Sequence, residues 1–306
     1  MEQAKTVSLV LGGGGARGLA HIGAIRWLTE NGYTIRSIAG SSMGALVGGI
    51  YAAGKLEAYA NWVLALERLA VIRLLDLSFD RAGLFKGERI MTVLRALIGD
   101  HVIQELPISY TAVATDLESG KEVWLREGKL FDAIRASIAT PLVFTPFVCR
   151  GRVLLDGSLV NPIPIAPTLN DDTDLTIAVS LSGRAEARPL PSTPAQAPGP
   201  AAFSYRQRIR SFIESLQRTR VASVGARGPV DITFASMEMM QNTIARLKLA
   251  AYSPDVTVEI PRNAARYFEF WRAQELIELG HERTMRAFEK NGKAAANDGV
   301  ALVAAK

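Results

Sequence analysis

The sequence predicts an α/β fold of three layers, in which a central, mainly parallel sheet is covered by helices on both faces. Short apolar runs alternate with helix-forming stretches from the first residues onward, an order that is typical of parallel sheets. Two glycine-containing turns, at residues 12–18 and 40–44, each lie between an apolar run and a helical stretch. Open α/β sheets bind their ligands at such turns, beside the carboxyl ends of the strands.

The N-terminal elements follow from this alternation. Residues 7–11 predict a buried strand, and the glycine turn after them leads into a helix up to about residue 30. Residues 34–39 predict the next strand, and the second turn leads into a helix that ends near Gly54, before a mostly helical stretch at 56–98. Further strands are expected at residues 110–116, 122–126, 152–155 and 176–181, and a helix at 130–139.

Composition divides the chain into three parts. Residues 1–182 carry the alternation and the motifs, so they are expected to form the core. Residues 183–203 are rich in proline and predict a linker or loop. Residues 204–306 are expected to add helices and strands that complete or cap the same domain. Within this part, strands are expected at 230–234 and 256–259, and helices at 237–251 and 265–290.

The first glycine turn reads GGGGARG over residues 12–18. Free backbone amides in such a loop can bind an anion. A phosphate-binding P-loop would continue with Gly-Lys-Ser/Thr, which this chain lacks. A dinucleotide site fits the spacing of Gly13, Gly15 and Gly18 but requires an acidic residue about twenty positions later, where the chain has Tyr33-Thr34-Ile35-Arg36.

The second turn is a GxSxG pentapeptide with Ser42 at its centre, between Gly40 and Gly44. A strand that turns sharply into a helix requires small residues two before and two after the serine, because a side chain there would collide with neighbouring backbone. The pattern predicts a nucleophile elbow that presents the Ser42 hydroxyl.

A serine nucleophile requires a base, and the three histidines of the chain are poor candidates. His21 lies on the helix after the glycine turn, where a buried structural imidazole is expected, and His101 and His281 lie at or in helices outside the usual order of serine, acid and histidine. A carboxylate is the remaining option. Asp156 follows an apolar run and precedes Gly157, an arrangement that aims its carboxylate at a fixed point; a plain turn aspartate is the alternative.

Taken together, the glycine turn at 12–18, the pentapeptide at 40–44 and Asp156-Gly157 resemble the patatin-like phospholipases, serine acyl hydrolases that work with a Ser-Asp dyad. The segments at 136–141 and 161–164 resemble the regions that flank the aspartate in that family. The resemblance covers residues 5 to about 182. One difference is visible, because the family usually has Gly or Ala after Asp-Gly and this chain has Ser158; we expect altered hydrogen bonding near Asp156 rather than lost activity.

The resemblance implies a role for each site residue. Ser42 would attack an ester carbonyl to form an acyl-enzyme, and Asp156 would accept its proton. Arg17 would order the glycine loop or attract an anionic head group; a surface cation near a helix start is the alternative. Backbone amides would stabilise the tetrahedral oxyanion, at about 3 kcal/mol per donor, and the expected donors are Gly13, Gly14, Gly15 and Met43.

The implied activity is hydrolysis of phospholipids, lysophospholipids or smaller carboxylic esters, without a cofactor or a metal. Two other functions share the same motifs. An acyltransferase would pass the Ser42 acyl group to an acceptor other than water, and a regulatory protein would bind lipid with negligible turnover. The sequence leaves the acyl length, the head group and the oligomeric state open.

Composition favours a globular intracellular protein. The chain has 306 residues, of which 48% are hydrophobic, enough for a large core. One cysteine, Cys149, excludes an intrachain disulfide, and no signal peptide is apparent, so a cytoplasmic location is expected. The net charge of +5 invites a nucleic-acid interpretation, but no DNA- or RNA-binding module is recognisable.

The stretch from Ser204 to Ser223 predicts a basic amphipathic helix. Apolar residues recur at helical spacing, and five arginines are offset by Glu214 alone. Such a helix after a tether suggests peripheral contact with an anionic membrane surface. The alternative is a helix that packs on the core and exposes its arginines.

Overall fold

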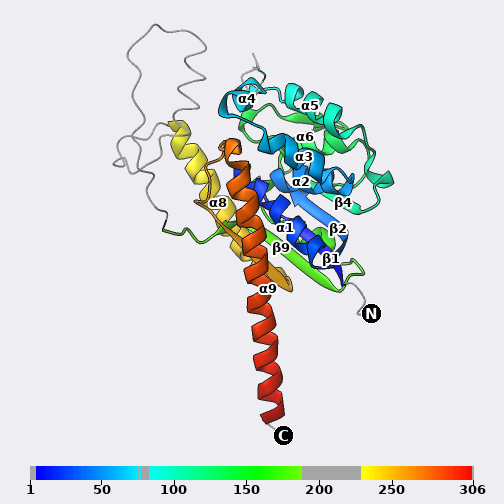
Figure 1. The fold of residues 1–306 in the computed structure, drawn as a ribbon. Helices are drawn as coiled ribbons and strands as arrows, with labels where there is room; N and C mark the ends of the chain where they lie inside the picture. The colour runs from blue at the N-terminus through cyan, green and yellow to red at the C-terminus, as the bar shows by residue number, and fades with distance from the viewer. Residues whose placement is uncertain (1–4, 75, 77–82, 188–228, 305–306) are drawn as a thin grey trace.

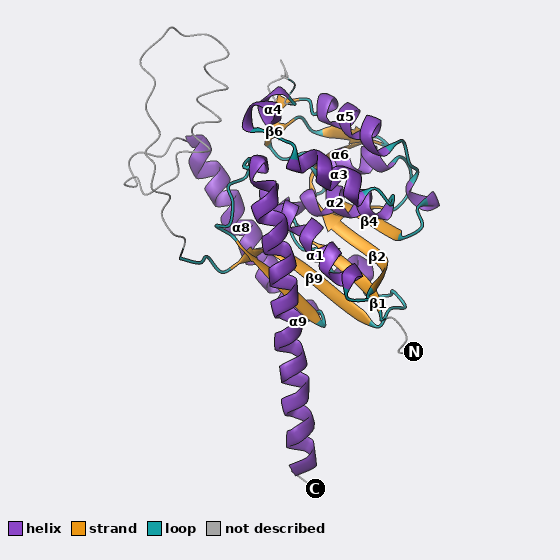
Figure 2. Cartoon of the chain, in the orientation of Figure 1, coloured by secondary structure: helices purple, strands orange, loops and turns teal. Residues whose placement is uncertain are grey.

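The computed structural model describes residues 5–74, 76, 83–187 and 229–304, and it confirms the predicted α/β fold. A mixed sheet lies at the centre, with helices on both of its faces (Figures 1 and 2). Its strand order in the described residues is β10-β9-β1-β2-β4-β8-β7, with β5 also paired to β4. The strands are β1 (Thr6–Leu11), β2 (Thr34–Ser41), β4 (Ser109–Asp116), β5 (Glu122–Leu125), β7 (Phe147–Cys149), β8 (Arg152–Asp156), β9 (Leu175–Gly183) and β10 (Val256–Pro261).

Eight α-helices are described around this sheet. They are α1 (Ala20–Glu30), α2 (Met43–Ala52), α3 (Leu56–Leu64), α4 (Arg68–Arg73), α5 (Glu88–Ile98), α6 (Leu130–Ser137), α8 (Pro229–Tyr252) and α9 (Ala273–Ala304). Two short strands, β3 (Gly83–Phe85) and β6 (Leu142–Phe144), pair with each other outside the main sheet. In the part of the chain that the structure describes, no helix is long and apolar enough to cross a membrane.

The strands from β10 through β9, β1 and β2 to β4 are parallel, whereas β5, β7 and β8 pair in antiparallel fashion. The sheet is therefore mainly parallel in its centre, as predicted. Register brings the two glycine turns together, because Leu11 at the end of β1 lies opposite Gly40 on β2. In the same way, Ser41 lies opposite Val113 on β4, and the next residue, Ala114, lies opposite Asp156 on β8.

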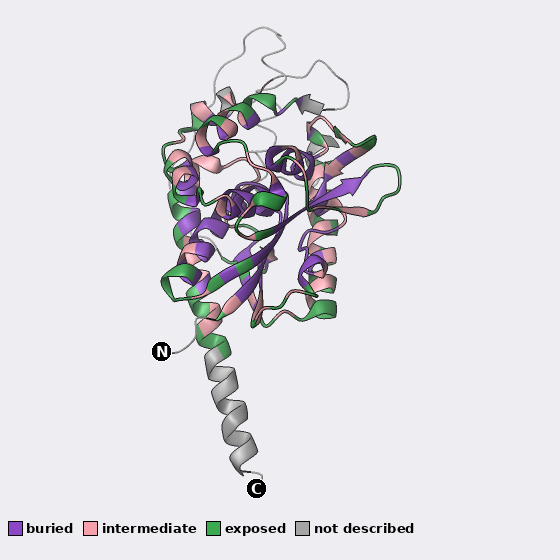
Figure 3. Ribbon diagram, turned by 90° about the vertical axis from the view of Figure 1, so that its right-hand side faces the viewer, coloured by how far each residue is buried: buried purple, intermediate pink, exposed green. Residues whose placement is uncertain are grey.

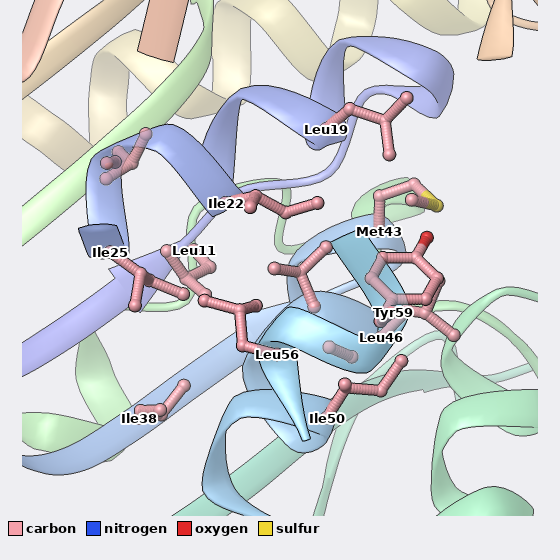
Figure 4. Packing of buried hydrophobic residues seen from close by; sticks show 14 of the residues in the cluster. Leu11, Leu19, Ile22, Ile25, Ile38, Met43, Leu46, Ile50, Leu56 and Tyr59 are labelled. Carbon is pink, nitrogen blue, oxygen red and sulfur yellow. The ribbon is translucent and has the colours of Figure 1, made fainter. Parts of the chain in front are cut away.

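Successive side chains of a strand point to opposite faces of the sheet, and apolar side chains are buried on both faces. Leu9 and Leu11 on β1 are fully buried in the larger cluster, against helices α1, α2 and α9, whereas Val10 between them packs with Ala245 of α8 on the other face. Burial is concentrated in the strands and the inward surfaces of the helices (Figure 3). Figure 4 shows part of the larger cluster, with Leu19, Ile22 and Ile25 facing Met43, Leu46, Ile50, Leu56 and Tyr59.

The predicted strand at 230–234 is wrong, because these residues lie in α8. A five-residue apolar run does not distinguish a strand from a buried helical turn, and Pro229 suits the first turn of a helix. Phe234 and Glu238 are four residues apart, which places them on the same face of a helix. Both contact the core from that face, since Phe234 packs against Tyr267 and Glu238 pairs with Arg17. The last helix also begins later than predicted, at Ala273, after a 3-10 turn at Phe270–Arg272.

The predicted amphipathic helix from Ser204 to Ser223 lies outside the described residues, as does most of the proline-rich segment at 183–203. The elements after them join the same sheet and the same helical layer. Strand β10 pairs with β9, and α9 packs along α1.

Two glycines allow α1 and α9 to approach closely. A Cβ at Gly280 would lie 1.9 Å from the backbone oxygen of Ala20, and one at Gly23 would lie 1.8 Å from that of Ile277. Only hydrogen atoms fit at these two crossings, so the contact of the helices depends on both glycines.

We therefore expect Gly280→Ala to lower the free energy of unfolding by roughly 2–3 kcal/mol, because the methyl group must push the two helices apart. Urea unfolding followed by circular dichroism measures the change. Glu289→Ala, at an exposed position of the same helix, is the control. Equal stability of Gly280→Ala and the control would contradict the close packing.

Candidate active site

Ser42 stands at a sharp turn between β2, which ends at Ser41, and α2, which begins at Met43. Its φ of 53° and ψ of −121° lie in a region that non-glycine residues rarely adopt. The two flanking glycines are required for steric reasons, as predicted. A Cβ at Gly40 would lie 2.4 Å from the carbonyl oxygen of Gly44, and one at Gly44 would lie 2.0 Å from that of Leu11. This is the geometry of a nucleophile elbow.

The strained turn is held from the side by Ser137, at the end of α6. The amide of Ser42 donates to Oγ of Ser137 at 2.9 Å, and this hydroxyl donates to the carbonyl oxygen of Val113 at 2.6 Å. Ser137 is fully buried. It thereby links the elbow to strand β4 and fixes the orientation of Ser42.

Asp156 lies at the carboxyl end of β8 with its side chain directed at Ser42. The Ser42 hydroxyl donates to Oδ2 of Asp156 at 2.8 Å, although 114 positions separate the two residues. The other oxygen, Oδ1, accepts the amide of Ser158 at 2.8 Å. Thr140 also donates to Oδ2, at 2.6 Å. The structure thus brings together the two residues that the sequence singled out as nucleophile and base.

The carboxylate of Asp156 is deeply buried, with 2% of the residue exposed, and Ser42 is 3% exposed. Burial raises the pKa of Asp156, whereas the hydrogen bonds from Thr140, Ser158 and Ser42 lower it in part. A buried carboxylate binds a proton more tightly than one in water. The environment therefore increases the basicity of the group that contacts the serine hydroxyl.

The glycine turn approaches the same point, but its amides differ in availability. Gly13 donates to the carbonyl oxygen of Pro162 at 3.0 Å, and Ala16 donates to that of Tyr267 at 2.9 Å. Within the described residues, the amides of Gly14, Gly15 and Met43 make no hydrogen bond. The prediction that Gly13 is an oxyanion donor is corrected by this geometry, since its single N–H is already engaged.

Arg17 is buried, with 6% of the residue exposed. Its Nε donates to the carbonyl oxygen of Gly14 at 3.1 Å, and Nη1 donates to that of Arg262 and pairs with Glu238 at 2.8 Å. These contacts favour the loop-ordering role over attraction of a head group. Arg17 joins the glycine turn to α8 and to the end of β10.

An apolar pocket opens beside the elbow. Ser42, Met43 and Gly15 lie on its wall together with Tyr267, and most of the remaining lining is aliphatic or aromatic. The other lining residues come from the part of the chain between α2 and β6 and from the segment before α9: Leu46, Tyr59, Trp62, Val63, Leu66, Val71, Leu74, Ile90, Met91, Ile138, Phe144, Phe268 and Phe270. Such a surface suits a hydrocarbon chain.

The motifs and their geometry agree with the comparisons to known proteins. The family model described as patatin-like phospholipase matches residues 9–169, which include both Ser42 and Asp156. The chain belongs to the patatin-like phospholipase family. An uncharacterised NTE family protein of Mycobacterium tuberculosis is 39% identical over 92% of this chain and 91% of its own length.

Two further similarities are more distant or partial. The lysophospholipase NTE1 of Kluyveromyces lactis is 31% identical over 94% of this chain, which spans 20% of that protein. Among solved structures, VipD from Legionella pneumophila aligns with 94% of this chain and 67% of its own, at 12% identity and a TM-score of 0.42.

Ser158, the difference from the usual pattern of this patatin-like family, occupies a crowded position. Its Oγ lies 3.3 Å from Oγ of Ser41, and a Cβ at Gly13 would lie only 1.8 Å from it. The Ser158 hydroxyl also contributes a hydrogen bond that lowers the pKa of Asp156. The Ser158 side chain therefore places a hydroxyl beside Asp156 that Gly or Ala would lack.

Sequence reasoning missed several side chains of this site, including Tyr267 before α9. Ser137 and Thr140 lie within the segment at 136–141 that was noted as a flank of the aspartate, but their roles depend on the register of α6 and β8. Neither histidines nor metal ligands gather here: the described residues contain no group of three or more His, Cys, Asp or Glu side chains that could hold a metal ion.

His21 has the structural role that was expected. Its Nε2 donates to the carbonyl oxygen of Gly12 at 2.7 Å, while Nδ1 is buried without a partner. Burial lowers the pKa of His21 to about 4, although the Gly12 hydrogen bond acts in the opposite direction. The imidazole is neutral at pH 7 and supports the start of the glycine turn.

This pKa predicts acid sensitivity of the fold. The unfolded chain gains a proton on His21 below pH 6.5 while the folded chain stays neutral to about pH 4, so stability falls as the pH falls through this window, by about 3 kcal/mol in total. We expect His21→Gln to lose less stability than the wild type between pH 7 and pH 4 in urea unfolding. His281→Gln, at a partly exposed position, is the control; parallel losses in all three proteins would contradict the assignment.

Proposed function

We propose that this protein is a serine acyl hydrolase that cleaves carboxylic esters of phospholipids or lysophospholipids, with Ser42 as nucleophile and Asp156 as its base. The observation that carries the proposal is the 2.8 Å hydrogen bond from the Ser42 hydroxyl to Asp156 at the wall of an apolar pocket. A nucleophile in direct contact with its base, on a strained elbow, is the arrangement that covalent acyl transfer requires.

In the first step, Oγ of Ser42 bonds to the ester carbonyl carbon as its proton moves to Oδ2 of Asp156. Burial raises the pKa of this carboxyl, which favours the transfer. The tetrahedral oxyanion would be stabilised by the free amides of Gly14, Gly15 and Met43, at about 3 kcal/mol each. The ester C–O bond then breaks, and the proton on Asp156 passes to the leaving alcohol.

In the second step, water enters in place of the alcohol. Asp156 accepts a proton from this water as its oxygen attacks the acyl carbon, and the proton returns to Oγ of Ser42 when the acyl bond breaks. The products are a free fatty acid and the resting enzyme. No cofactor takes part in this sequence, because Asp156 both removes and returns the proton.

Two findings support a lipid substrate. The pocket beside Ser42 is lined by apolar side chains that could enclose an acyl chain, and a relative that aligns with 94% of this chain is a lysophospholipase. Transfer of the acyl group to another acceptor would use the same first step, so product analysis separates the two reactions.

Ser42→Ala and Asp156→Asn are each expected to lower ester hydrolysis by at least about 10³-fold without unfolding the chain, because each removes one member of a unit that acts together. Release of fatty acid from lysophosphatidylcholine, measured by mass spectrometry, reports the activity. Ser182→Ala and Asp172→Asn are matched controls at positions away from the dyad.

Wild-type turnover in either dyad variant would refute the proposed mechanism. Labelling with a fluorophosphonate adds a second readout, because only an activated serine reacts; labelling that persists in Ser42→Ala would assign the reactive group elsewhere. Formation of an acylated alcohol in place of fatty acid would identify a transferase.

The pocket assignment makes a separate prediction. Val63 lies on the pocket wall and is 1% exposed, so Val63→Phe should narrow the pocket and lower kcat/KM for a C16 acyl ester by about tenfold or more relative to a C4 ester. Val148→Phe, at a position with 67% exposure, is the control. An equal loss for the two chain lengths would show that the acyl chain binds elsewhere.

A further inference from the structure

Two hydroxyl groups converge on one oxygen of Asp156, and a third lies behind one of them. Ser42 and Thr140 both donate to Oδ2, at 2.8 and 2.6 Å, and Oγ1 of Thr140 lies 2.6 Å from the phenol oxygen of Tyr267. Thr140 is 2% exposed, so its hydroxyl depends on protein partners. The proposed mechanism uses Ser42 and Asp156 but assigns nothing to Thr140 or Tyr267.

The direction of these hydrogen bonds follows from the protons available. An ionised carboxylate can only accept, so the single proton of Thr140 must point to Asp156. The short contact with Tyr267 then requires the phenol to donate to Thr140. Burial, followed by the nearby charge of Asp156, raises the pKa of Tyr267 well above its usual value, although its hydrogen bonds with Thr140 and Ser42 act in the opposite direction. The phenol therefore keeps the proton that it donates.

Tyr267 is held firmly in this position. It lies between β10 and the 3-10 turn before α9, and its carbonyl oxygen accepts the amide of Ala16 at 2.9 Å. Its ring lies so close to Gly15 that a Cβ there would be 2.7 Å from Cδ2 of the tyrosine. Phe234 and Phe268 pack against the ring, with centroids at 6.2 and 4.9 Å.

We propose that Tyr267 is a positioning residue for the proposed reaction: its phenol commits the Thr140 hydroxyl to Asp156, and so keeps Oδ2 ionised and directed at Ser42. The inference rests on the proposed function, since it requires Asp156 to act as the base. No covalent bond changes along Tyr267 and Thr140; the only proton that moves is the one that passes from Ser42 to Asp156.

Thr140 has another acceptor within reach, which explains why the phenol is needed. The carbonyl oxygen of Ile138 lies 3.4 Å from Oγ1 of Thr140, so without Tyr267 the hydroxyl is free to turn toward the backbone. The Thr140 hydrogen bond is the largest of the contributions that lower the pKa of Asp156 against its burial. Its loss would raise that pKa and leave less of the base ionised at a given pH.

The test is the pH dependence of Tyr267→Phe, which keeps the ring and removes the hydroxyl. For hydrolysis of p-nitrophenyl butyrate, we expect kcat to fall about tenfold with KM within about twofold of the wild type. The acidic limb of the kcat/KM profile should move to higher pH by roughly half a unit or more, because the base must be ionised to accept the proton. Tyr252→Phe removes a phenol at the end of α8 and is the matched control.

A double-mutant cycle tests whether Tyr267 acts through Thr140. Thr140→Val should shift the acidic limb in the same direction as Tyr267→Phe, and the double variant should be no slower than Thr140→Val alone. Thr140→Ser, which restores a hydroxyl at the same place, should recover the wild-type profile. Thermal unfolding of each variant separates a kinetic effect from misfolding.

Several outcomes would overturn the inference. These are a Tyr267→Phe profile that superimposes on the wild type, a change confined to KM, which would make Tyr267 only a pocket wall, or fully additive losses in the double variant. If Ser42→Ala or Asp156→Asn retains turnover, the proposed function fails instead, and that result is independent of Tyr267.

Discussion

The structure depends on one buried carboxylate that is stabilised without an ion pair among the contacts described for it. The hydrogen bonds that Asp156 accepts come from Ser42, Thr140 and both the amide and the hydroxyl of Ser158, which are all neutral. An ionised group is costly to bury unless hydrogen bonds replace its hydration. A nearby cation would stabilise it further but would also lower its basicity. Neutral donors satisfy the carboxylate while burial keeps its pKa raised.

Close approach of backbone segments makes this arrangement possible. A Cβ at Gly157 would lie 2.0 Å from the carbonyl oxygen of Val113, and one at Gly13 would lie 3.0 Å from Cβ of Ser42. Register then sets the distance across the sheet, since Ser41 and Asp156 lie opposite the consecutive residues Val113 and Ala114 of β4. Close contacts between backbone segments thus require glycine at these positions. The same contacts explain why the motifs consist of small residues.

Much of this site could be predicted from the sequence because its signals are local. An elbow is visible as GxSxG, and an aspartate before a glycine at the end of an apolar run indicates a carboxylate on a fixed turn. What could not be predicted depends on register and on distant segments. The amide of Gly13 is engaged by Pro162, Ser137 holds the elbow, and Tyr267 enters from the C-terminal third; none of these contacts has a sequence pattern. The apolar run at 230–234 was ambiguous for a different reason, since helical contacts by Phe234 and Glu238 decide its structure.

The C-terminal third therefore contributes to the site as well as to the sheet. Residues 9–169, which match the family model, include Ser42, Asp156 and the glycine turn, but that turn is fixed from outside this range. Tyr267 accepts the amide of Ala16, and Glu238 pairs with Arg17, whose Nε in turn holds the carbonyl oxygen of Gly14. The free amides of Gly14 and Gly15 thus lie between two anchors that belong to α8 and to the segment before α9. The proposed oxyanion site must be rigid before the reaction begins and would depend on these anchors, so the proposed dyad and its electrostatic environment come from different parts of the chain.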